Sequence, residues 1–499
     1  MEGRKNTSLE FAWSAEEVKR VGYKVVDLMA DYLAQLPSRP VFQPVPAEHG
    51  EALISSTLPR AGESIDEILD RFAKTIAPYP FGNGSPKFYG WVNSPPAIVG
   101  VMAEALAAAM NPSVAGGNHA AVWIEHQVLQ WFKQLVGFPS DSMGLLVSGA
   151  SAAAITALNV ARYRACSARG WNVRATGLDA VSADRPKLLI YKGVEGHACH
   201  QRAVELLGIG SENLRLVPTG DDLRLQPDAL DRMLAEDLAA GHVVVAVIAS
   251  AGTVNTGAID PIDAIADVCA RHRVWLHVDA AYGGPAIMTD RYAVALGPLA
   301  RADSIALDPH KWMYVPVDAG LVLVRDSAAM RDAFSLVPPY LRTDGNMRGV
   351  QGPTWFSEYG AEQTRPFRAL KVWAALRYFG TDGYRVLLEH DIKLAGHLAD
   401  RIRRTADYEV WEPTSLSIVC FRAIPPALRD RQDAIDAFNK RLLEDLQLSG
   451  DGFLSGTVLN QRFWLRACIV NPLASTSDVD AVFDAVRASA SRLLRPALE

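Results

Sequence analysis

The stretch that decides the fold class begins with VVVAVIAS at 243–250, continues through a helical run that ends at His272, and finishes with VWLHV at 274–278. Asp260 and Pro261 stand where this helix should start, as its N-cap and first-turn residues. A β-branched run, a helix and a second β-branched run in this order are typical of a parallel βαβ unit with a right-handed crossover. The stretch therefore predicts an α/β fold.

Apolar runs of strand length recur on both sides of this unit. Most are apolar on both faces, which is typical of a mainly parallel sheet covered by helices. The further candidates lie at 144–148, 187–191, 304–307 and 320–324. They alternate with helical stretches, so we expect residues 95–384 to form one large domain.

Helical patterns flank this predicted domain at both ends. Residues 1–94 contain two capping-box starts, at Ser14 and Ser64, and each is followed by an apolar stripe. We expect either a helical arm, whose stripe packs on the main body or on a second subunit, or a helical subdomain folded on its own chain. Residues 385–499 return to helix and antiparallel-type strand and predict a small α+β domain.

Composition excludes several classes of protein. Of the 499 residues, 49% are hydrophobic and 21% are charged, which excludes a disordered or fibrous polymer. Fifty Lys and Arg against 56 Asp and Glu give a net charge of −6, so a nucleic-acid partner is not expected.

No membrane partner, export signal or disulfide framework is expected either. The longest apolar stretch near the middle of the chain, 97–110, is interrupted by Glu104 and is shorter than the roughly 20 residues of a membrane span. Residues 1–20 contain no apolar signal-peptide core. The five cysteines form no CxxC pair, which argues against a zinc site and favours reduced thiols. We therefore expect a cytoplasmic protein.

Unusual groups follow three of the predicted strands, at the carboxyl ends where open α/β sheets bind ligands. SGAS at 148–151 precedes a helix, so its free N–H groups and hydroxyl suit a phosphate, unless the small residues serve packing alone. Asp279 ends a buried run, where a carboxylate needs a partner unless it caps a helix. Lys311 lies between apolar flanks, where burial would lower the pKa of a nucleophilic amine, unless the side chain reaches the surface.

A phosphate cradle, a strand-end carboxylate and a strand-end lysine are the groups that pyridoxal 5'-phosphate requires. With these residues the chain resembles the group II pyridoxal-phosphate-dependent decarboxylases, which include aromatic L-amino acid, histidine and glutamate decarboxylases. The matching runs occur in the family's order along nearly the whole chain: SGAS, EGHACH at 195–200, AGTVNTGAID at 251–260, HVDAAYGG at 277–284, DPHKW at 308–312 and PFRALKVW at 366–373. The resemblance implies the aspartate aminotransferase-like fold (fold type I), whose large domain has a mainly parallel seven-stranded sheet.

The resemblance also implies roles for residues around the cofactor ring. Lys311 would form the Schiff base, and Asp279 would keep the pyridinium nitrogen protonated. His197 would stack on one face of the ring, while Ala281 would pack against the other.

A second group of residues would hold the rest of the cofactor. Ala150, Ser151 and Thr253 are implied to bind the phosphate and the ring-oxygen region. Asp308 and His310 flank the lysine. Many family members carry Asn in place of Asp308, and an aspartate would repel a phosphate, so we interpret Asp308 as a residue that orients His310.

The substrate side of the site is implied by two further segments. Tyr340, in LVPPYLRTDG, resembles the loop tyrosine that returns a proton to the substrate carbon, although an incidental surface tyrosine would look the same. FYGWVNS at 88–94 resembles the substrate-pocket stretch, and its aromatic character favours a flat ring, with Trp91 and Ser94 as contacts. A homologous homodimer would have its active sites at the subunit interface, with Thr364 reaching across it.

Two other candidates have competing interpretations. His197 and His200 lie one helical turn apart, but no Cys, Asp or Glu set completes a metal site, so no metal is expected. Arg466, in FWLRACIV, is either a carboxylate partner or part of a structural ion pair.

These features predict decarboxylation of an aromatic L-amino acid to the corresponding arylalkylamine and CO2. One alternative is an aromatic aldehyde synthase of the same family, which oxidises the decarboxylated product, but the presence of Tyr340 and His197 favours simple decarboxylation. Another is a decarboxylase of a non-aromatic amino acid. A non-catalytic scaffold would have lost Lys311 or Asp279, and both are present.

Overall fold

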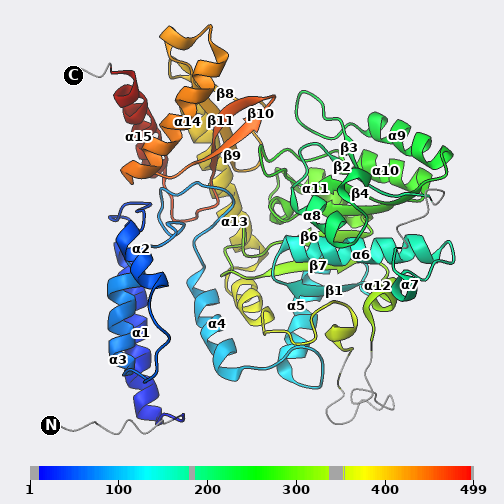
Figure 1. Cartoon of the computed structure of the whole chain (residues 1–499), viewed down its shortest axis with the longest axis horizontal. Helices are drawn as coiled ribbons and strands as arrows, with labels where there is room; N and C mark the ends of the chain where they lie inside the picture. The colour runs from blue at the N-terminus through cyan, green and yellow to red at the C-terminus, as the bar shows by residue number, and fades with distance from the viewer. Residues whose placement is uncertain (1–10, 179–185, 337–351, 353, 496–499) are drawn as a thin grey trace.

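The computed structural model describes residues 11–178, 186–336, 352 and 354–495. Its centre is a seven-stranded sheet in the order β1-β7-β6-β5-β4-β2-β3 (Figure 1). The strands are β1 (Met143–Val147), β2 (Leu188–Gly193), β3 (Leu214–Val217), β4 (Val243–Ser250), β5 (Trp275–Asp279), β6 (Ser304–Leu307) and β7 (Gly320–Val324). Strand β7 is antiparallel to β1 and β6, and the other neighbours are parallel. The predicted fold class is confirmed.

One strand of this sheet was not predicted from the sequence. Strand β3, with the sequence LRLV, pairs with β2 at the edge of the sheet, and three of its four residues are not fully buried. A short edge strand that contains Arg215 has no continuous apolar run. It therefore gave no signal of the kind that identified the central strands.

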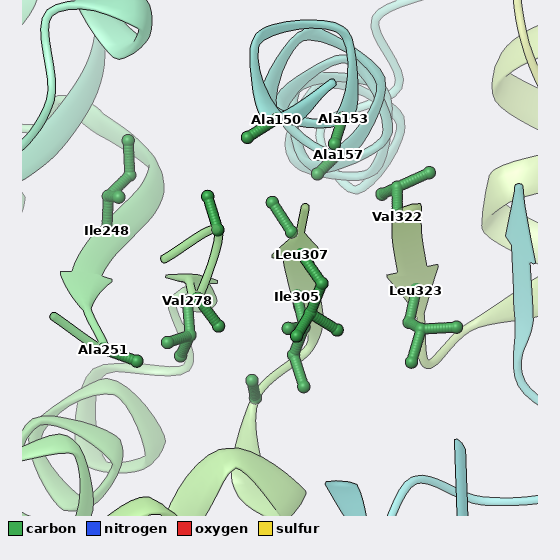
Figure 2. Close-up of a cluster of buried hydrophobic side chains, with 14 of the residues drawn as sticks. Ala150, Ala153, Ala157, Ile248, Ala251, Val278, Ile305, Leu307, Val322 and Leu323 are labelled. Atoms are coloured by element: carbon green, nitrogen blue, oxygen red, sulfur yellow. The ribbon is translucent and has the colours of Figure 1, made fainter. Parts of the chain in front are cut away.

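Helix α6 (Ala150–Ser167) packs across the middle of the sheet and begins at the phosphate-cradle candidate. Figure 2 shows Ala150, Ala153 and Ala157 on the side of α6 that faces the strands. These small side chains let the helix approach the sheet closely. The other helices of this region are α4 (Ile98–Met110), α5 (Ala120–Val136), α7 (Val173–Thr176), α8 (Cys199–Leu206), α9 (Pro227–Ala239), α10 (Ile262–His272), α11 (Ala293–Leu296) and α12 (Ser327–Phe334).

Helix α10 begins at Ile262, and Asp260 does not cap it as expected. Its carboxylate accepts hydrogen bonds from the backbone N–H groups of Leu225 (2.8 Å) and Ser250 (2.7 Å). Burial raises the pKa of Asp260 to about 6. The side chain therefore joins the end of β4 to a distant loop, a contact that local spacing cannot reveal.

A second sheet lies beside the first, in the order β10-β11-β9-β8, and all its neighbours are antiparallel. Its strands are β8 (Tyr408–Val410), β9 (Ile418–Ala423), β10 (Ser455–Leu459) and β11 (Arg462–Cys468), and α14 (Gln432–Ser449) and α15 (Thr476–Leu494) pack with it. Helix α13 (Ala369–Arg403) has a break at Gly380, where φ is 62°. Beyond this break, Leu388 belongs to the core of the first sheet and Leu394 to that of the second, so α13 connects the two cores.

The N-terminal helices stand along one side of the molecule, away from the seven-stranded sheet (Figure 1). They are α1 (Ala15–Gln35), α2 (Ala47–Ile54), α3 (Ile65–Arg71) and the π-helical turn η1 (Phe72–Ile76). Asp66 of α3 pairs with Arg20 (3.1 Å) and Lys24 (2.5 Å) of α1. The capping box at Ser64 is present. No helix among the described residues has both the length and the apolar character needed to cross a bilayer.

The backbone of Gly320, in β7, lies so close to the turn before α6 that no room is left for a side chain. A Cβ atom at this position would lie 2.3 Å from the Cα of Gly149, in the turn before α6. Gly320→Ala must displace that turn, so we expect a loss of about 1–3 kcal/mol in the free energy of unfolding, measured by urea denaturation.

Gly396→Ala is the matched control. Gly396 is exposed in α13, and an added Cβ would meet no atom within 4 Å. Alanine is the better helix former, so this variant should gain about 0.5–1 kcal/mol. A Gly320→Ala variant as stable as Gly396→Ala would contradict the proposed backbone clash.

Candidate active site

A cavity of about 440 Å³ lies at the carboxyl ends of β1, β4, β5 and β6 and contains most of the predicted site residues. The helix start after β1, the loop after β2 and the turn after β6 all contribute to its wall. The predicted residues that line it are Trp91, Ala150, Ser151, His197, Thr253, Asp279, Ala281, Asp308, His310 and Lys311. The structure thus brings together groups that are more than two hundred residues apart in the sequence.

Two predicted residues do not line this cavity, and the position of a third is not described. Ser94 is buried beside it, and its hydroxyl lies 3.5 Å from the carbonyl oxygen of His310. Thr364 is exposed and lies outside the cavity wall of this chain. Tyr340 falls outside the described residues.

The start of α6 has the properties of a phosphate site. Its N-cap is Gly149, and no side chain caps the first turn. The N–H groups at the start of a helix lack partners inside the helix, and the helix dipole adds a partial positive charge there. Ala150 and Ser151 therefore offer unsatisfied donors to an anion in the cavity.

Lys311 and Asp308 form an ion pair inside the cavity. The amine Nζ donates to Asp308 Oδ2 at 2.9 Å, and the lysine side chain is 25% exposed. Burial alone lowers the pKa of Lys311, but the carboxylates of Asp308 and Asp279 outweigh burial and raise the pKa above its ordinary value. The expected lowering of this pKa is therefore wrong for the chain by itself.

Asp308 lies closer to the lysine than to His310. Its Oδ2 is 2.9 Å from Lys311 Nζ and 3.7 Å from His310 Nε2. The imidazole is held instead by the backbone of Ala319, whose carbonyl oxygen and amide nitrogen lie 2.8 Å and 3.1 Å from His310 Nδ1. The other carboxylate oxygen, Asp308 Oδ1, is buried without a hydrogen-bond partner among the described residues.

Asp279 ends β5 and is largely buried, with its side chain 12% exposed. Its Oδ1 accepts the backbone N–H of Ala281 at 3.1 Å. Burial by itself would raise the pKa of Asp279, but His200 and Lys311 hold it below the ordinary value, so the carboxylate is ionised. No α-helix begins here, so Asp279 is not a helix cap.

His197 enters the cavity from the loop after β2. Its Nδ1 accepts the backbone N–H of Cys199 at 3.1 Å, which fixes the orientation of the ring. Burial lowers the pKa of His197. At neutral pH the ring is therefore uncharged and presents a flat face suited to stacking.

His200 and Asp279 are in contact, with Nε2 and Oδ2 3.3 Å apart, and this contact was not predicted from the sequence. Potential metal-ligand atoms of Cys199, His200 and Asp279 lie within 4.8 Å of one another, a set that differs from the His197 and His200 pair considered from spacing. From the sequence, no Cys, Asp or Glu was expected to complete such a site, whereas the fold brings Cys199 and Asp279 to His200. Burial raises the pKa of the Cys199 thiol to about 12. The spacing of His197 and His200 in the sequence could have drawn attention to His200. Only the fold shows that His200 contacts the carboxylate of Asp279.

Arg466 of β11 is 3% exposed and has no carboxylate partner in the part of the chain that the structure describes. Its Nη1 donates to the carbonyl oxygen of Trp91 at 2.9 Å, and its Nε donates to that of Asn255 at 3.1 Å. The interpretation as a structural ion pair therefore has no support among these residues.

The residues present fit pyridoxal phosphate. Uncapped N–H groups suit its phosphate, the ionised carboxylate of Asp279 suits a protonated ring nitrogen, and Lys311 is the amine that a Schiff base requires. All three lie around one cavity, as the order of their strands in the sheet dictates.

Comparisons with known proteins agree with this geometry. The family model described as the pyridoxal-dependent decarboxylase conserved domain matches residues 47–424. The aromatic-L-amino-acid decarboxylase of Bacillus atrophaeus is 33% identical over 96% of this chain and 97% of its own length. The phenylacetaldehyde synthase of Arabidopsis thaliana is 28% identical, over 96% and 97% of the two chains.

Solved structures show the same similarity. The crystal structure of Oryza sativa TDC with PLP and tryptamine superposes with a TM-score of 0.88 at 27% identity, and covers 97% of this chain and 99% of that one. A family model that spans most of the sequence, a relative that matches along its full length and a site that suits the cofactor lead to one conclusion. The chain belongs to the pyridoxal-dependent decarboxylase family and is a carboxy-lyase that uses pyridoxal phosphate.

Proposed function

We propose that the protein decarboxylates an aromatic L-amino acid and releases the corresponding arylalkylamine and CO2. The observation that carries the aromatic preference is a cluster of rings at the cavity. Trp91 lines the cavity, is 46% exposed, and stacks on Phe81 with ring centroids 5.4 Å apart. Phe453 lies 5.3 Å from Trp91 and stacks on Phe88 at 4.9 Å. An exposed ring face backed by other rings favours a flat apolar side chain.

The chain's own residues would serve the reaction in distinct ways. Bound pyridoxal phosphate supplies the electron sink that accepts the electron pair left when CO2 departs. Lys311 would hold the cofactor covalently until the substrate amine displaces it, and the ionised Asp279 would keep the ring nitrogen protonated. His197, uncharged and fixed by the Cys199 N–H, would stack on the ring and limit the geometry of the scissile bond.

We propose that Tyr340 returns the proton to the substrate carbon, which gives an amine. This role rests on the sequence match alone. The alternative product, an aldehyde, is favoured by one observation, since relatives along the full length of the chain include a phenylacetaldehyde synthase. Both Tyr340 and His197 are present in this chain, which supports the amine.

Trp91 depends on the second sheet for its conformation, and this suggests a role for Arg466. The backbone of Trp91 is left-handed, with φ of 48°, a conformation that is strained for a bulky side chain. Its N–H donates to Ser455 Oγ at 3.3 Å, and its carbonyl oxygen accepts from Arg466 Nη1 at 2.9 Å. We propose Arg466 as a positioning residue that holds the Trp91 ring against the substrate.

We propose further that the protein is a homodimer whose partner covers the N-terminal arm. The arm exposes large apolar side chains along α1, α3 and η1, where a lone chain would leave them in water. They include Val18, Tyr23, Val25, Val26, Ile68, Phe72 and Ile76. A groove of about 870 Å³ also lies between α1 and η1. In such a dimer the exposed Thr364 would contribute to the partner's site.

The reaction is tested by incubating the purified protein and pyridoxal phosphate with each of the twenty common amino acids and with dopa. We expect CO2 from aromatic substrates with an equal amount of amine. Aldehyde and peroxide in amounts equal to CO2 would show an aldehyde synthase, and CO2 from glutamate or histidine alone would contradict the aromatic preference. Lys311→Ala should lose both the visible absorption of the bound cofactor and the release of CO2.

Arg466→Met should raise the KM for an aromatic substrate about tenfold and change kcat less. The expected size is that of one lost hydrogen bond from a charged donor, roughly 1.5 kcal/mol. Arg462→Met is the matched control on the same strand, because Arg462 is 37% exposed and pairs with Asp433 at 3.0 Å on the outside. Equal KM values for the two variants would refute the positioning role.

Sedimentation equilibrium tests the dimer. We expect a mass twice that of the 54.2 kDa chain. Val25→Glu would place a charge on the exposed apolar stripe and should shift the population towards monomer. A wild-type protein that sediments as a monomer at micromolar concentration would overturn the proposed assembly.

A further inference from the structure

His200 is a fully buried histidine for which the proposed reaction so far has no use. It is the second residue of α8, and its Nε2 lies 3.3 Å from Asp279 Oδ2. Neither ring nitrogen has a hydrogen bond of good geometry among the described residues, so the 3.3 Å contact with Asp279 is a close approach that falls short of one. Buried polar groups need a polar partner, and the carboxylate of Asp279 is the close polar contact that the structure shows for the His200 ring.

The protonation states of the pair make His200 the hydrogen-bond donor. Burial lowers the pKa of His200 to about 4, so the imidazole is neutral at neutral pH and carries one N–H. Asp279 is ionised, because its electrostatic contacts with His200 and Lys311 and the N–H of Ala281 hold its pKa below the ordinary value against the cost of burial. An ionised carboxylate accepts only, so a hydrogen bond between the two side chains requires His200 Nε2–H as the donor.

The other titratable groups packed around His200 and Asp279 are consistent with His200 as the donor. His277 of β5, whose ring centroid is 6.2 Å from that of His200, is itself neutral because burial lowers its pKa to about 3. Its Nδ1 lies 2.9 Å from Ser304 Oγ. Lys192 of β2 donates to the carbonyl oxygens of Gly196 and His197, at 2.8 Å and 3.3 Å.

Four more ionisable groups lie near the pair. His197, in the loop after β2, is uncharged because burial lowers its pKa, and its Nδ1 accepts the Cys199 N–H. On α8, Cys199 keeps its proton, as its raised pKa of about 12 indicates. Lys311 and Asp308, in the turn after β6, form their own ion pair at 2.9 Å. Of the groups that face Asp279, His200 is therefore the neutral side-chain donor.

We propose that His200 is a positioning residue that donates its Nε2–H to Asp279 Oδ2, while the Ala281 N–H holds Oδ1, so that the carboxylate stays ionised and faces the cofactor ring nitrogen in one orientation. The inference rests on the proposed function, because it assigns His200 a task only in a protein that binds pyridoxal phosphate. It acts through Asp279 and needs no contact with the substrate.

Removal of this donor has a definite electrostatic consequence. A carboxylate that loses a hydrogen bond becomes more basic, so Asp279 would compete more strongly for the proton of the cofactor's ring nitrogen. The ring would then carry less positive charge, and the Schiff base that Lys311 would form would keep its proton to higher pH. Both the affinity for the cofactor and the pH dependence of its visible absorption should change.

The test compares His200→Phe, which fills the space without a donor, with His200→Gln, which retains an N–H donor. We expect His200→Phe to bind pyridoxal phosphate with visible absorption, a Kd about tenfold higher and an absorption midpoint about one pH unit higher. His200→Gln should stay close to wild type. His277→Gln, which alters a buried histidine bonded to Ser304, should leave both values unchanged.

Other outcomes would overturn the inference. Identical Kd and midpoint in His200→Phe and wild type would remove the electrostatic role, and equal defects in His200→Phe and His200→Gln would reduce His200 to packing. Stoichiometric zinc in the wild type that is lost in His200→Phe would replace the proposal with a metal site. Absence of visible absorption in the wild type would instead overturn the proposed function itself, and the inference with it.

Discussion

The ion pair of Lys311 with Asp308, in a cavity that also contains the ionised Asp279, constrains the rest of the structure. Two carboxylates face one amine, so the cluster carries one negative charge in excess. Buried charges are costly unless they are paired and hydrogen-bonded. A protonated ring nitrogen beside Asp279 would supply the missing positive charge. The phosphate would lie at the other end of the site, where the uncapped start of α6 offers N–H groups.

The sheet topology brings these groups together. Strands β5 and β6 are parallel neighbours, so Asp279 and Lys311 emerge at the same edge. Strand β7 runs antiparallel between β6 and β1, and the close approach of Gly320 to Gly149 sets the turn of the phosphate cradle beside the lysine turn. Since a side chain at Gly320 would displace that turn, the cofactor site and the stability of the sheet edge are coupled.

The second sheet contributes to the site through buried polar contacts. Ser455 of β10 accepts the backbone N–H of Trp91, and Arg466 of β11 donates to its carbonyl oxygen. In the turn that follows Lys311, Trp312 Nε1 donates to Asp391 of α13 at 2.9 Å, and burial raises the pKa of that carboxyl group to about 7. These contacts link the lysine turn and the aromatic cluster to helices and strands from the far end of the sequence.

The sequence by itself determined the α/β class, six of the seven central strands, and the position of SGAS, Asp279 and Lys311 at strand ends, because buried strands are continuous apolar runs. It could not predict β3, whose charged edge sequence lacks that run, or that Asp260 bonds to Leu225 and Ser250. The raised pKa of Lys311, the contact of His200 with Asp279 and the hold of Arg466 on Trp91 were decided only by the tertiary structure. Periodicity reports which segments are buried, whereas the partner of a buried polar group depends on residues that folding brings from elsewhere in the chain.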